Sequence, residues 1–212
     1  MRALLLIASL TTILLTGCNT SPKHVLIETT MGNIKVMLYP ETPLHRDNFY
    51  NLAKEGYYDG TLFHRVIPNF MIQGGDPDSK DAAPGQPLGG GGPGYTIDNE
   101  IGAPHLRGTL AAARNNNPEK KSSGSQFYIV TGTPQTDATI DRIERMKGIK
   151  YNEIQRRLYK ENGGRPDLDQ EYTVFGEVVE GMDVVDQIAA VARGAADRPN
   201  EDVRMISVRP VN

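Results

Sequence analysis

Residues 63–77, FHRVIPNFMIQGGDP, are the stretch of sequence that decides the fold. Their apolar positions follow neither a helical period nor the strict alternation of a half-buried strand. Pro68 would break the interior of a helix, and in a strand it would remove a donor from the ladder. Arg65 and Gln73 interrupt this apolar run. The stretch therefore predicts a bent, apolar segment with polar side chains set into it for a specific task.

The composition describes an ordinary globular chain with many turns. The 212 residues allow one domain or two small ones, and 38% of them are hydrophobic, enough for a packed core. The net charge is -3 and the basic residues form no continuous stripe, which argues against a nucleic-acid-binding role. The 22 glycines and 14 prolines favour an all-β domain with long loops.

The amino terminus reads as an export and anchoring segment. Residues 1–17 combine Arg2, an apolar run and small residues, which is typical of a signal peptide and too short for a stable membrane span. The four residues at 15–18, LTGC, resemble the lipobox of bacterial lipoproteins, in which the cysteine carries lipid. A plain signal peptide or a buried thiol are the alternatives, and the only cysteine excludes an intrachain disulfide.

This reading divides the chain into a signal peptide over 1–17, a short lipid-anchored tether over 18–23 and a domain over 24–212. The lipid on Cys18 would hold the domain close to a membrane of the cell envelope, facing the periplasm. Asn19 does not resemble the aspartate that retains lipoproteins in the inner membrane, so the outer membrane is favoured.

Further along the chain, hydrophobic alternation and turn residues predict many short strands. Residues 24–30 and 33–39 form a hairpin, and Thr42 and Pro43 begin a helix that stops at Gly56. Four more strands are predicted at 108–113, 126–131, 172–179 and 203–208. A second helix is predicted at 181–190. Together they predict a closed β-barrel capped by helices.

The loop over 78–94 contains a literal G-x-G-x-x-G at Gly89, Gly91 and Gly94. A dinucleotide site needs a strand before this motif and a helix after it. A Gly/Pro-rich loop precedes it here and a strand-like YTI follows it, so we reject the nucleotide interpretation.

Residues 137–164 form a charged segment with helical periodicity, which Gly148 divides. The i,i+4 pairs Asp141/Arg145 and Glu153/Arg157 would support exposed helices. We therefore predict a solvated helical insertion in the surface.

The opening stretch resembles the signature of the cyclophilins, the cyclosporin-type peptidyl-prolyl cis–trans isomerases. Three further segments resemble the same family in the same order: GTLAAAR over 108–114, GSQFYI over 124–129 and VFGEVVEGMD over 174–183. The resemblance covers 24–212 apart from the insertion. It implies a mainly β fold, a closed eight-stranded antiparallel β-barrel capped by two α-helices, and an outer groove for proline-containing peptides and unfolded proteins. It also implies a monomer without cofactor or metal.

The chemistry of X-Pro rotation fits these residue types. The planar peptide bond is held by a rotational barrier of about 18–20 kcal/mol, and no bond must be broken to cross it. A dry pocket for the proline ring and a fixed cationic donor can favour the twisted state over the planar one. Arg65 suits the donor role because its guanidinium is permanently charged and rigid.

The resemblance assigns catalysis to Arg65. It assigns substrate binding to a set of nine residues: Phe70, Met71, Gln73, Ala113, Arg114, Gln126, Tyr128, Leu168 and Tyr172. Tyr172 stands where histidine is usual and Arg114 where asparagine usually contacts the substrate backbone. The insertion enters just before Leu168, so we expect it to restrict or extend the substrate groove.

The leading hypothesis is a lipid-anchored isomerase that assists the folding of envelope proteins without a covalent intermediate. A proline-peptide binding module or holdase with little turnover is the first alternative. The second is a scaffold whose partner docks on the insertion at 137–164. The presence of Arg65 favours the enzyme.

Overall fold

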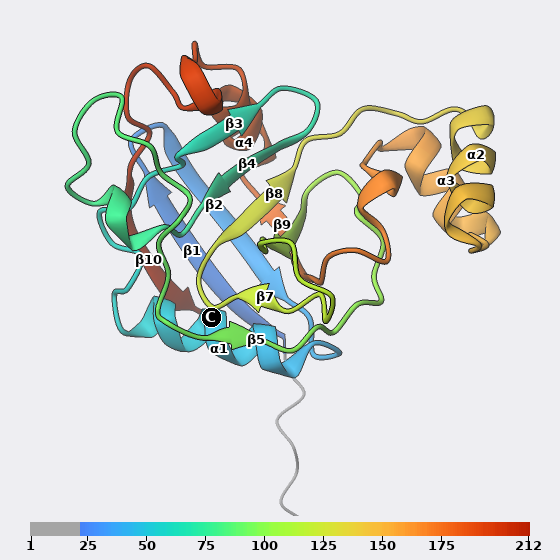
Figure 1. The fold of residues 1–212 in the computed structure, drawn as a ribbon, viewed down its shortest axis with the longest axis horizontal. Helices are drawn as coiled ribbons and strands as arrows, with labels where there is room; N and C mark the ends of the chain where they lie inside the picture. The colour runs from blue at the N-terminus through green and yellow to red at the C-terminus, as the bar shows by residue number, and fades with distance from the viewer. Residues whose placement is uncertain (1–21) are drawn as a thin grey trace, which may run out of the picture.

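The computed structural model describes residues 22–212, so the signal peptide and Cys18 lie outside the described residues. Eight strands form one curled antiparallel sheet with helices around it (Figure 1). The strands are β1 (Lys23–Thr29), β2 (Gly32–Leu38), β3 (Arg65–Ile67), β4 (Met71–Gly74), β5 (Thr96–Ile97), β6 (Thr109–Ala112), β7 (Ser122–Ser123), β8 (Phe127–Val130), β9 (Val174–Glu180) and β10 (Met205–Val211). The helices are α1 (Pro43–Lys54), α2 (Asp137–Lys147), α3 (Glu153–Glu161) and α4 (Met182–Ala189), with 3-10 turns η1 (Pro77–Ser79), η2 (Pro166–Leu168) and η3 (Ala195–Asp197).

The eight-stranded sheet has the order β10-β1-β2-β9-β6-β8-β4-β3, so it has two edges, and the predicted closed barrel is wrong. The edge strand β3 has only three residues, because the turn at Pro68 ends it. The chain just before β3 crosses the gap instead. The Phe63 amide donates to Val203 O at 2.9 Å and the Met205 amide to Thr61 O at 2.8 Å. A single bridge between Leu62 and Arg204 lies between these bonds, so loop backbone links the two edges.

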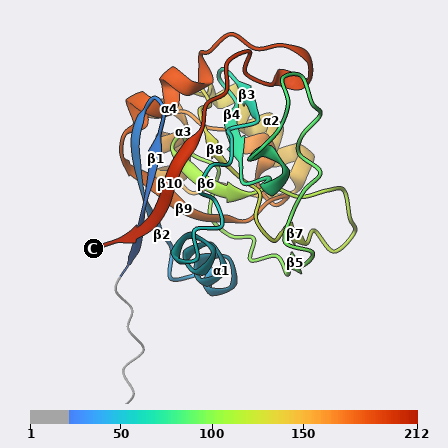
Figure 2. The same ribbon diagram turned by 90° about the vertical axis from the view of Figure 1, so that its left-hand side faces the viewer.

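Helices α1 and α4 pack on different strands of the sheet. Helix α1 contacts β1, β9 and β10, and α4 contacts β2, β3 and β4 (Figure 2). Burial alternates along β1 and β2, as expected for the predicted hairpin. The inward-pointing side chains include Val25, Ile27 and Val36, which belong to the main core. Phe49 of α1 meets Phe127 of β8 edge to face at 5.2 Å between ring centroids.

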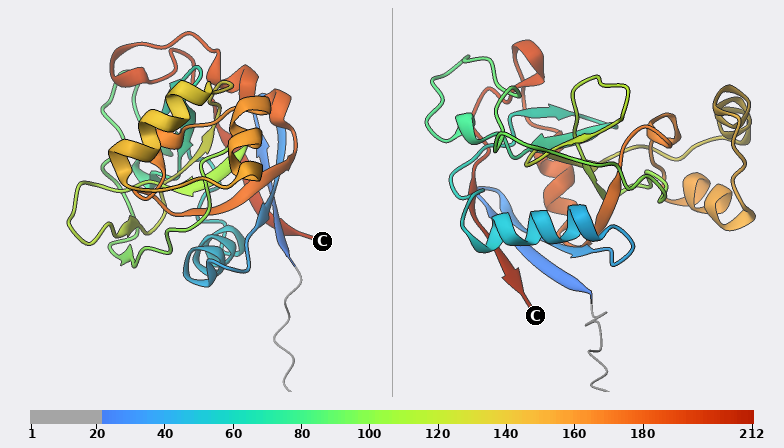
Figure 3. Two further views of the ribbon diagram at one scale, coloured as in Figure 1. Left: turned by 90° about the vertical axis from the view of Figure 1, so that its right-hand side faces the viewer. Right: turned by 60° about the horizontal axis from the view of Figure 1, so that its bottom comes forward.

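The insertion forms the two predicted helices and projects from the sheet (Figures 1 and 3). Gly148 ends α2 in the left-handed conformation, with φ 66°, and Asn152 forms a capping box with Gln155 at the start of α3. Unlike a wholly solvated segment, the insertion buries Ile140, Ile143 and Tyr159.

The ion pairs of the insertion also differ from the predicted ones. Arg156 of α3 bridges to Asp137, Asp141 and Glu144 of α2. Arg157 pairs with Glu161 rather than with Glu153. Ion pairs therefore link the two helices, because their packing brings Asp141 of α2 next to Arg156 of α3.

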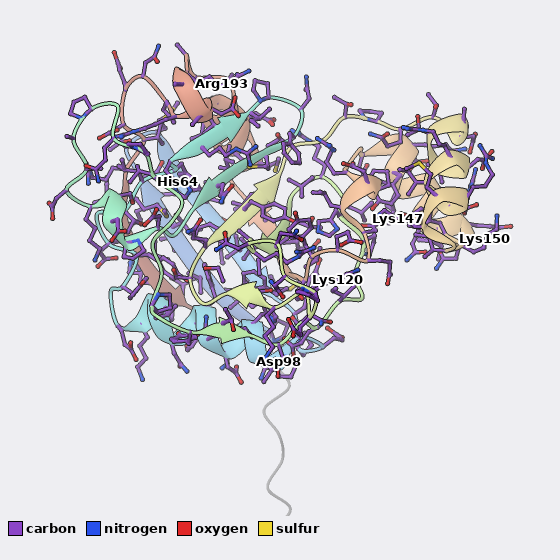
Figure 4. The ribbon with its side chains drawn as sticks, viewed as in Figure 1. His64, Asp98, Lys120, Lys147, Lys150 and Arg193 are labelled. Carbon is purple, nitrogen blue, oxygen red and sulfur yellow. The ribbon has the colours of Figure 1, made fainter. Side chains whose placement is uncertain are left out.

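The signature over 63–77 forms β3, a turn, β4 and the start of η1. Pro68 and Asn69 occupy the two central turn positions, Asn69 has φ 60°, and the Phe70 amide donates to Ile67 O at 3.1 Å. Proline at the second position and a positive φ at the third are the features of a type II turn. The turn divides the apolar run between two strands, which explains why the run follows no single hydrophobic period. His64, just before β3, is buried on the side of the sheet away from the insertion (Figure 4).

Replacing Gly75 by alanine is expected to destabilise the fold by about 3 kcal/mol. Gly75 has φ +88°, and a Cβ there would lie 2.3 Å from the Ser125 carbonyl oxygen. Gly60→Ala is the matched control, because φ is +80° but no atom lies within 4 Å; it should cost only the conformational strain of about 1–2 kcal/mol. Urea unfolding measures both, and equal losses would show that the close backbone approach is unimportant.

The stability of the chain should fall in acid because of His64. Burial lowers the pKa of His64 to about 4, while the same group in an unfolded chain titrates near 6.5. The unfolded state therefore takes up the proton first, and about 3 kcal/mol of stability is lost between pH 6.5 and pH 4. The free energy of unfolding of the wild type minus that of His64→Gln should shrink over this range. A difference that is constant from pH 7 to pH 4 would contradict the assignment.

Candidate active site

The hairpin of β3 and β4 places Arg65 directly opposite Gln73. Directly opposite residues on antiparallel strands project to the same side of the sheet. The Nη1 of Arg65 donates to Gln73 Oε1 at 3.5 Å. The type II turn between the strands thus brings together two side chains that are eight positions apart in the sequence.

A cavity of about 160 Å³ opens beside this pair. Its walls come from the hairpin, from β8 and from the chain around η2 and the start of β9. The cavity is lined by Arg65, Phe70, Met71, Gln73, Ala113, Arg114, Tyr128, Leu168 and Tyr172. The structure thus brings nine of the ten residues assigned from the sequence to one small cavity, and Gln126 lies in the adjoining one.

One wall of the cavity is apolar. Met71 and Tyr128 belong to a buried cluster separate from the main core, and Phe70, Leu168 and Tyr172 pack against that cluster. The rings of Tyr128 and Tyr172 meet edge to face at 5.8 Å. Such a surface offers a proline ring burial without a competing hydrogen bond.

Three polar groups fix the orientation of Gln73. Its Nε2 donates to Gln126 Oε1 at 3.1 Å, and Gln126 Nε2 donates in turn to the carbonyls of Gly89 and Gly91 at 2.9 and 2.8 Å. Gln73 therefore turns its oxygen, not its nitrogen, toward Arg65. The glycine loop that we rejected as a nucleotide site has this structural role.

Arg65 lies at the rim of the cavity, with 40% of its side chain exposed. Its guanidinium carbon is 5.9 Å from the centre of the Phe70 ring. Asp197 of η3 places a carboxylate oxygen 3.7 Å from Arg65 Nε. Arg65 lines the 160 Å³ cavity, where its guanidinium can meet the amide of a bound peptide, and it also lines a larger cavity.

Arg114 is held by its own chain. Its Nε and Nη2 donate to the Glu171 backbone oxygen and carboxylate at 3.0 and 3.1 Å, and its guanidinium carbon lies 4.9 Å from the centre of the Tyr172 ring. Its Nη1 donates to the Asn115 carbonyl at 3.3 Å, so three of the five guanidinium N–H donors are used within the chain. Two remain for the contact with substrate backbone that is expected from the sequence. Its observed position makes it a wall between the 160 Å³ cavity and the adjoining cavity of about 450 Å³.

A third cavity, of about 980 Å³, lies on the other side of Arg65 and Gln73. His64 lines it, and neither of its ring nitrogens has a hydrogen-bond partner among the described residues. Burial lowers the pKa of His64 to about 4, so the ring is neutral at pH 7 and does not supply a second cation beside Arg65.

The described residues contain no group of three or more His, Cys, Asp or Glu side chains arranged to hold a metal ion. Within residues 22–212 no helix is both long and apolar enough to cross a membrane.

Three residues next to the site were not predicted from the sequence: Asp197, His105 and Asp169. Asp197 is 132 positions from Arg65 in the sequence, and its backbone has φ 58°. His105 and Asp169 lie buried behind Tyr128, where His105 Nε2 is 3.0 Å from the Tyr128 hydroxyl. The one sequence signal for Asp169 is that it directly follows Leu168, a predicted residue of the substrate pocket.

Comparison with other proteins gives a consistent result. A family model described as cyclophilin type peptidyl-prolyl cis-trans isomerase/CLD matches residues 24–210. A putative peptidyl-prolyl cis-trans isomerase of Staphylococcus haemolyticus is 36% identical over 185 residues, which cover 87% of this chain and 89% of the relative. A putative bifunctional phosphatase/peptidyl-prolyl cis-trans isomerase of Streptococcus pyogenes is 41% identical over 190 residues, but the match spans only 38% of that longer protein.

The fold is also similar to solved structures. A cyclophilin type isomerase of Cryptosporidium parvum aligns with a TM-score of 0.67 at 24% identity, over 91% of this chain and 99% of the other. The same protein in the presence of the dipeptide Ala-Pro aligns with a TM-score of 0.65 at 25% identity, over 89% and 99% of the two chains. By the extent of the family match and the identity to its relatives, this chain belongs to the cyclophilin-type peptidyl-prolyl cis–trans isomerase family.

Proposed function

We propose that the chain catalyses cis–trans isomerisation of X-Pro bonds and that Arg65 is its catalytic residue. The observation that carries the proposal is the position of Arg65, a permanent cation at the rim of a small cavity with an apolar wall. Cavity and cation are what the reaction needs, since rotation about the prolyl bond breaks no covalent bond.

The proline ring occupies the cavity between Phe70, Met71 and Leu168, with Tyr128 and Tyr172 as further walls. As the C–N bond twists, the prolyl nitrogen loses conjugation with the preceding carbonyl and becomes a better hydrogen-bond acceptor. The Arg65 guanidinium donates to this nitrogen. Because the planar amide offers no comparable acceptor, the bond stabilises the twisted state selectively, and selective stabilisation accelerates the reaction.

Gln73 positions the catalytic arginine in this mechanism. Its oxygen holds Arg65 in place at low entropic cost, because Gln126 and the glycine loop have already fixed the amide. Ala113, Arg114 and Gln126 bind the peptide backbone outside the proline pocket, where the 450 Å³ cavity adjoins the site.

The substrates are proline-containing peptides and unfolded proteins, in keeping with the Cryptosporidium structure determined with Ala-Pro. We further propose that the chain acts as a monomer on proteins of the cell envelope, attached by a lipid on Cys18, with the outer membrane favoured over the inner one. The support for this part is the signal-like sequence over 1–17 and the LTGC motif.

Arg65→Ala should lower kcat/KM for a short X-Pro peptide by about 10²–10³-fold, the usual effect of removing one transition-state donor. Arg65→Lys should recover little, because the ammonium lacks the planar fork. Arg209→Ala, on strand β10, is the control for loss of one surface arginine and should leave the rate unchanged. A folded Arg65→Ala protein with wild-type turnover would refute the catalytic assignment. A wild type that binds proline peptides but does not turn them over would instead favour the holdase alternative.

Cys18→Ser should release the full chain from the membrane when it is expressed in a diderm bacterium. Wild type should sediment with outer-membrane vesicles and label with a palmitate analogue, because the lipid on Cys18 holds the chain on the membrane. Recovery of both proteins in the same soluble fraction, without label on the wild type, would refute the lipoprotein assignment.

A further inference from the structure

A buried carboxylate lies directly behind the proline cavity. Asp169 follows Leu168 of the cavity wall, and only 4% of its side chain is exposed. Four donors surround it. Oδ1 accepts from the His105 amide and lies 2.8 Å from His105 Nδ1, and Oδ2 accepts from the Tyr151 and Tyr159 hydroxyls, each at 2.6 Å. An ionised carboxylate at such a depth depends on every one of these bonds.

Two of the four donors come from the insertion. Tyr159 lies in α3 and is fully buried, and Tyr151 lies in the turn before α3. Burial raises the pKa of both phenols, so each keeps its proton and donates it to Asp169. Lys147, at the end of α2, donates to the Asp169 backbone oxygen at 2.8 Å, and it lies nearer the sheet than Lys150 does (Figure 4).

On its other side, the carboxylate orients a wall of the cavity. The Nδ1 of His105 lies against Asp169, and its Nε2 points to Tyr128. The Tyr128 hydroxyl lies 3.0 Å from that nitrogen, and the two rings stack with an interplanar angle of 11°. An unbroken chain of hydrogen bonds thus runs from Tyr151 and Tyr159 through Asp169 and His105 to Tyr128.

A second contact connects the insertion to the cavity at its neck, where residues 132–133 meet 163–164. A Cβ on Gly164 would lie 2.4 Å from the His105 carbonyl oxygen and 2.8 Å from the Tyr159 ring. The next residue, Arg165, donates its amide to His105 O at 2.8 Å and places its guanidinium carbon 4.1 Å from the centre of the Phe70 ring. The neck therefore contacts residues on two sides of the cavity: Arg165 lies against Phe70, and His105 lies behind Tyr128.

The geometry does not favour the groove-extension hypothesis. Among the described residues, none of those at 137–164 lines the 160 Å³ cavity or the two cavities that adjoin it. The insertion meets the site from behind, through the contacts of Tyr151 and Tyr159 with Asp169 and through its neck.

We propose that the insertion is a positioning element of the active site, which acts through the hydrogen bonds of Tyr151 and Tyr159 to Asp169 and of His105 to Tyr128. The inference rests on the proposed isomerase function. Tyr151, Tyr159, Asp169 and His105 touch no substrate in this arrangement; they set the position of Tyr128 and Leu168, which do.

The test removes the two hydroxyls and keeps the rings. Tyr151→Phe/Tyr159→Phe should lower kcat/KM for an X-Pro peptide by about threefold to tenfold, the range expected when a buried charged acceptor loses hydrogen bonds. The loss should lie mainly in KM, because the proline ring then meets a less ordered pocket. Tyr50→Phe, the same chemical change on helix α1, should alter neither constant. If the double variant does not fold, the single Tyr151→Phe carries the test, since Tyr151 is only half-buried.

A double-mutant cycle with Tyr128→Phe distinguishes an effect of the insertion on the position of Tyr128 from an effect on the stability of the fold alone. If the hydrogen-bond chain acts through the Tyr128 hydroxyl, removing the two insertion hydroxyls should cost much less in the Tyr128→Phe background than in the wild type. The ¹⁵N resonances of the His105 ring, measured in parallel, should shift in Tyr151→Phe/Tyr159→Phe. Equal losses in both backgrounds, or a lower melting temperature with unchanged kinetics and unchanged His105 resonances, would overturn the proposal.

Failure of the two proposals can be told apart. A wild type that shows no isomerisation would refute the function, while the His105 resonances and the affinity for an Ala-Pro peptide would still report whether the insertion positions the cavity. An active wild type with an insensitive cavity would refute only the positioning role.

Discussion

The arrangement at Arg65 depends on the buried carboxylate of Asp76. Asp76 is fully inaccessible to solvent and accepts from the amides of Asp78 and Gly89, at 2.9 and 2.5 Å. A carboxylate buried to this extent must keep such bonds, so it ties the glycine loop to the end of the signature. Without this tie, the carbonyls of Gly89 and Gly91 would have no fixed place, and neither would the Gln126 amide that they hold.

The cavity is thus held from two sides by polar groups. On the Arg65 side the hydrogen bonds run from the Asp76 carboxylate through the glycine loop and the amides of Gln126 and Gln73 to one cation. On the Tyr128 side they run from the Asp169 carboxylate through a histidine to the wall. The two carboxylates and the histidine are buried and do not line the cavity, whereas Gln73 and Arg65 do. Preorganised polar groups of this kind keep their position as the reaction proceeds, and that is the source of their effect.

The sequence predicted most of the fold and nearly all of the cavity wall, because those features depend on local patterns. Alternation located the hairpin of β1 and β2, and turn residues located Gly148 and Pro43. The resemblance then supplied Arg65, Met71 and the other wall residues from contiguous motifs. Closure of the barrel was predicted wrongly, since the length of β3 depends on a turn whose type no hydrophobic pattern specifies.

What could not be predicted depends on contacts between distant segments. Arg156 pairs with Asp141 across two helices because of their packing, although sequence spacing favoured pairs within each helix. Asp197 reaches Arg65 from 132 positions away, on a 3-10 turn with left-handed residues. The hydrogen bonds that join Tyr159, Asp169 and His105 likewise link three separate segments, so only the folded chain reveals them.

The glycine neck has a consequence for how such a chain can change in length. Gly132 and Gly164 approach so closely that a Cβ on Gly132 would lie 2.4 Å from the Gly164 carbonyl oxygen. Because its two ends meet, the insertion could change in length without moving the sheet, as long as the altered segment still supplies the two tyrosine hydroxyls to Asp169. The glycines of the neck are buried, so such changes belong in the exposed parts of the insertion rather than at the neck.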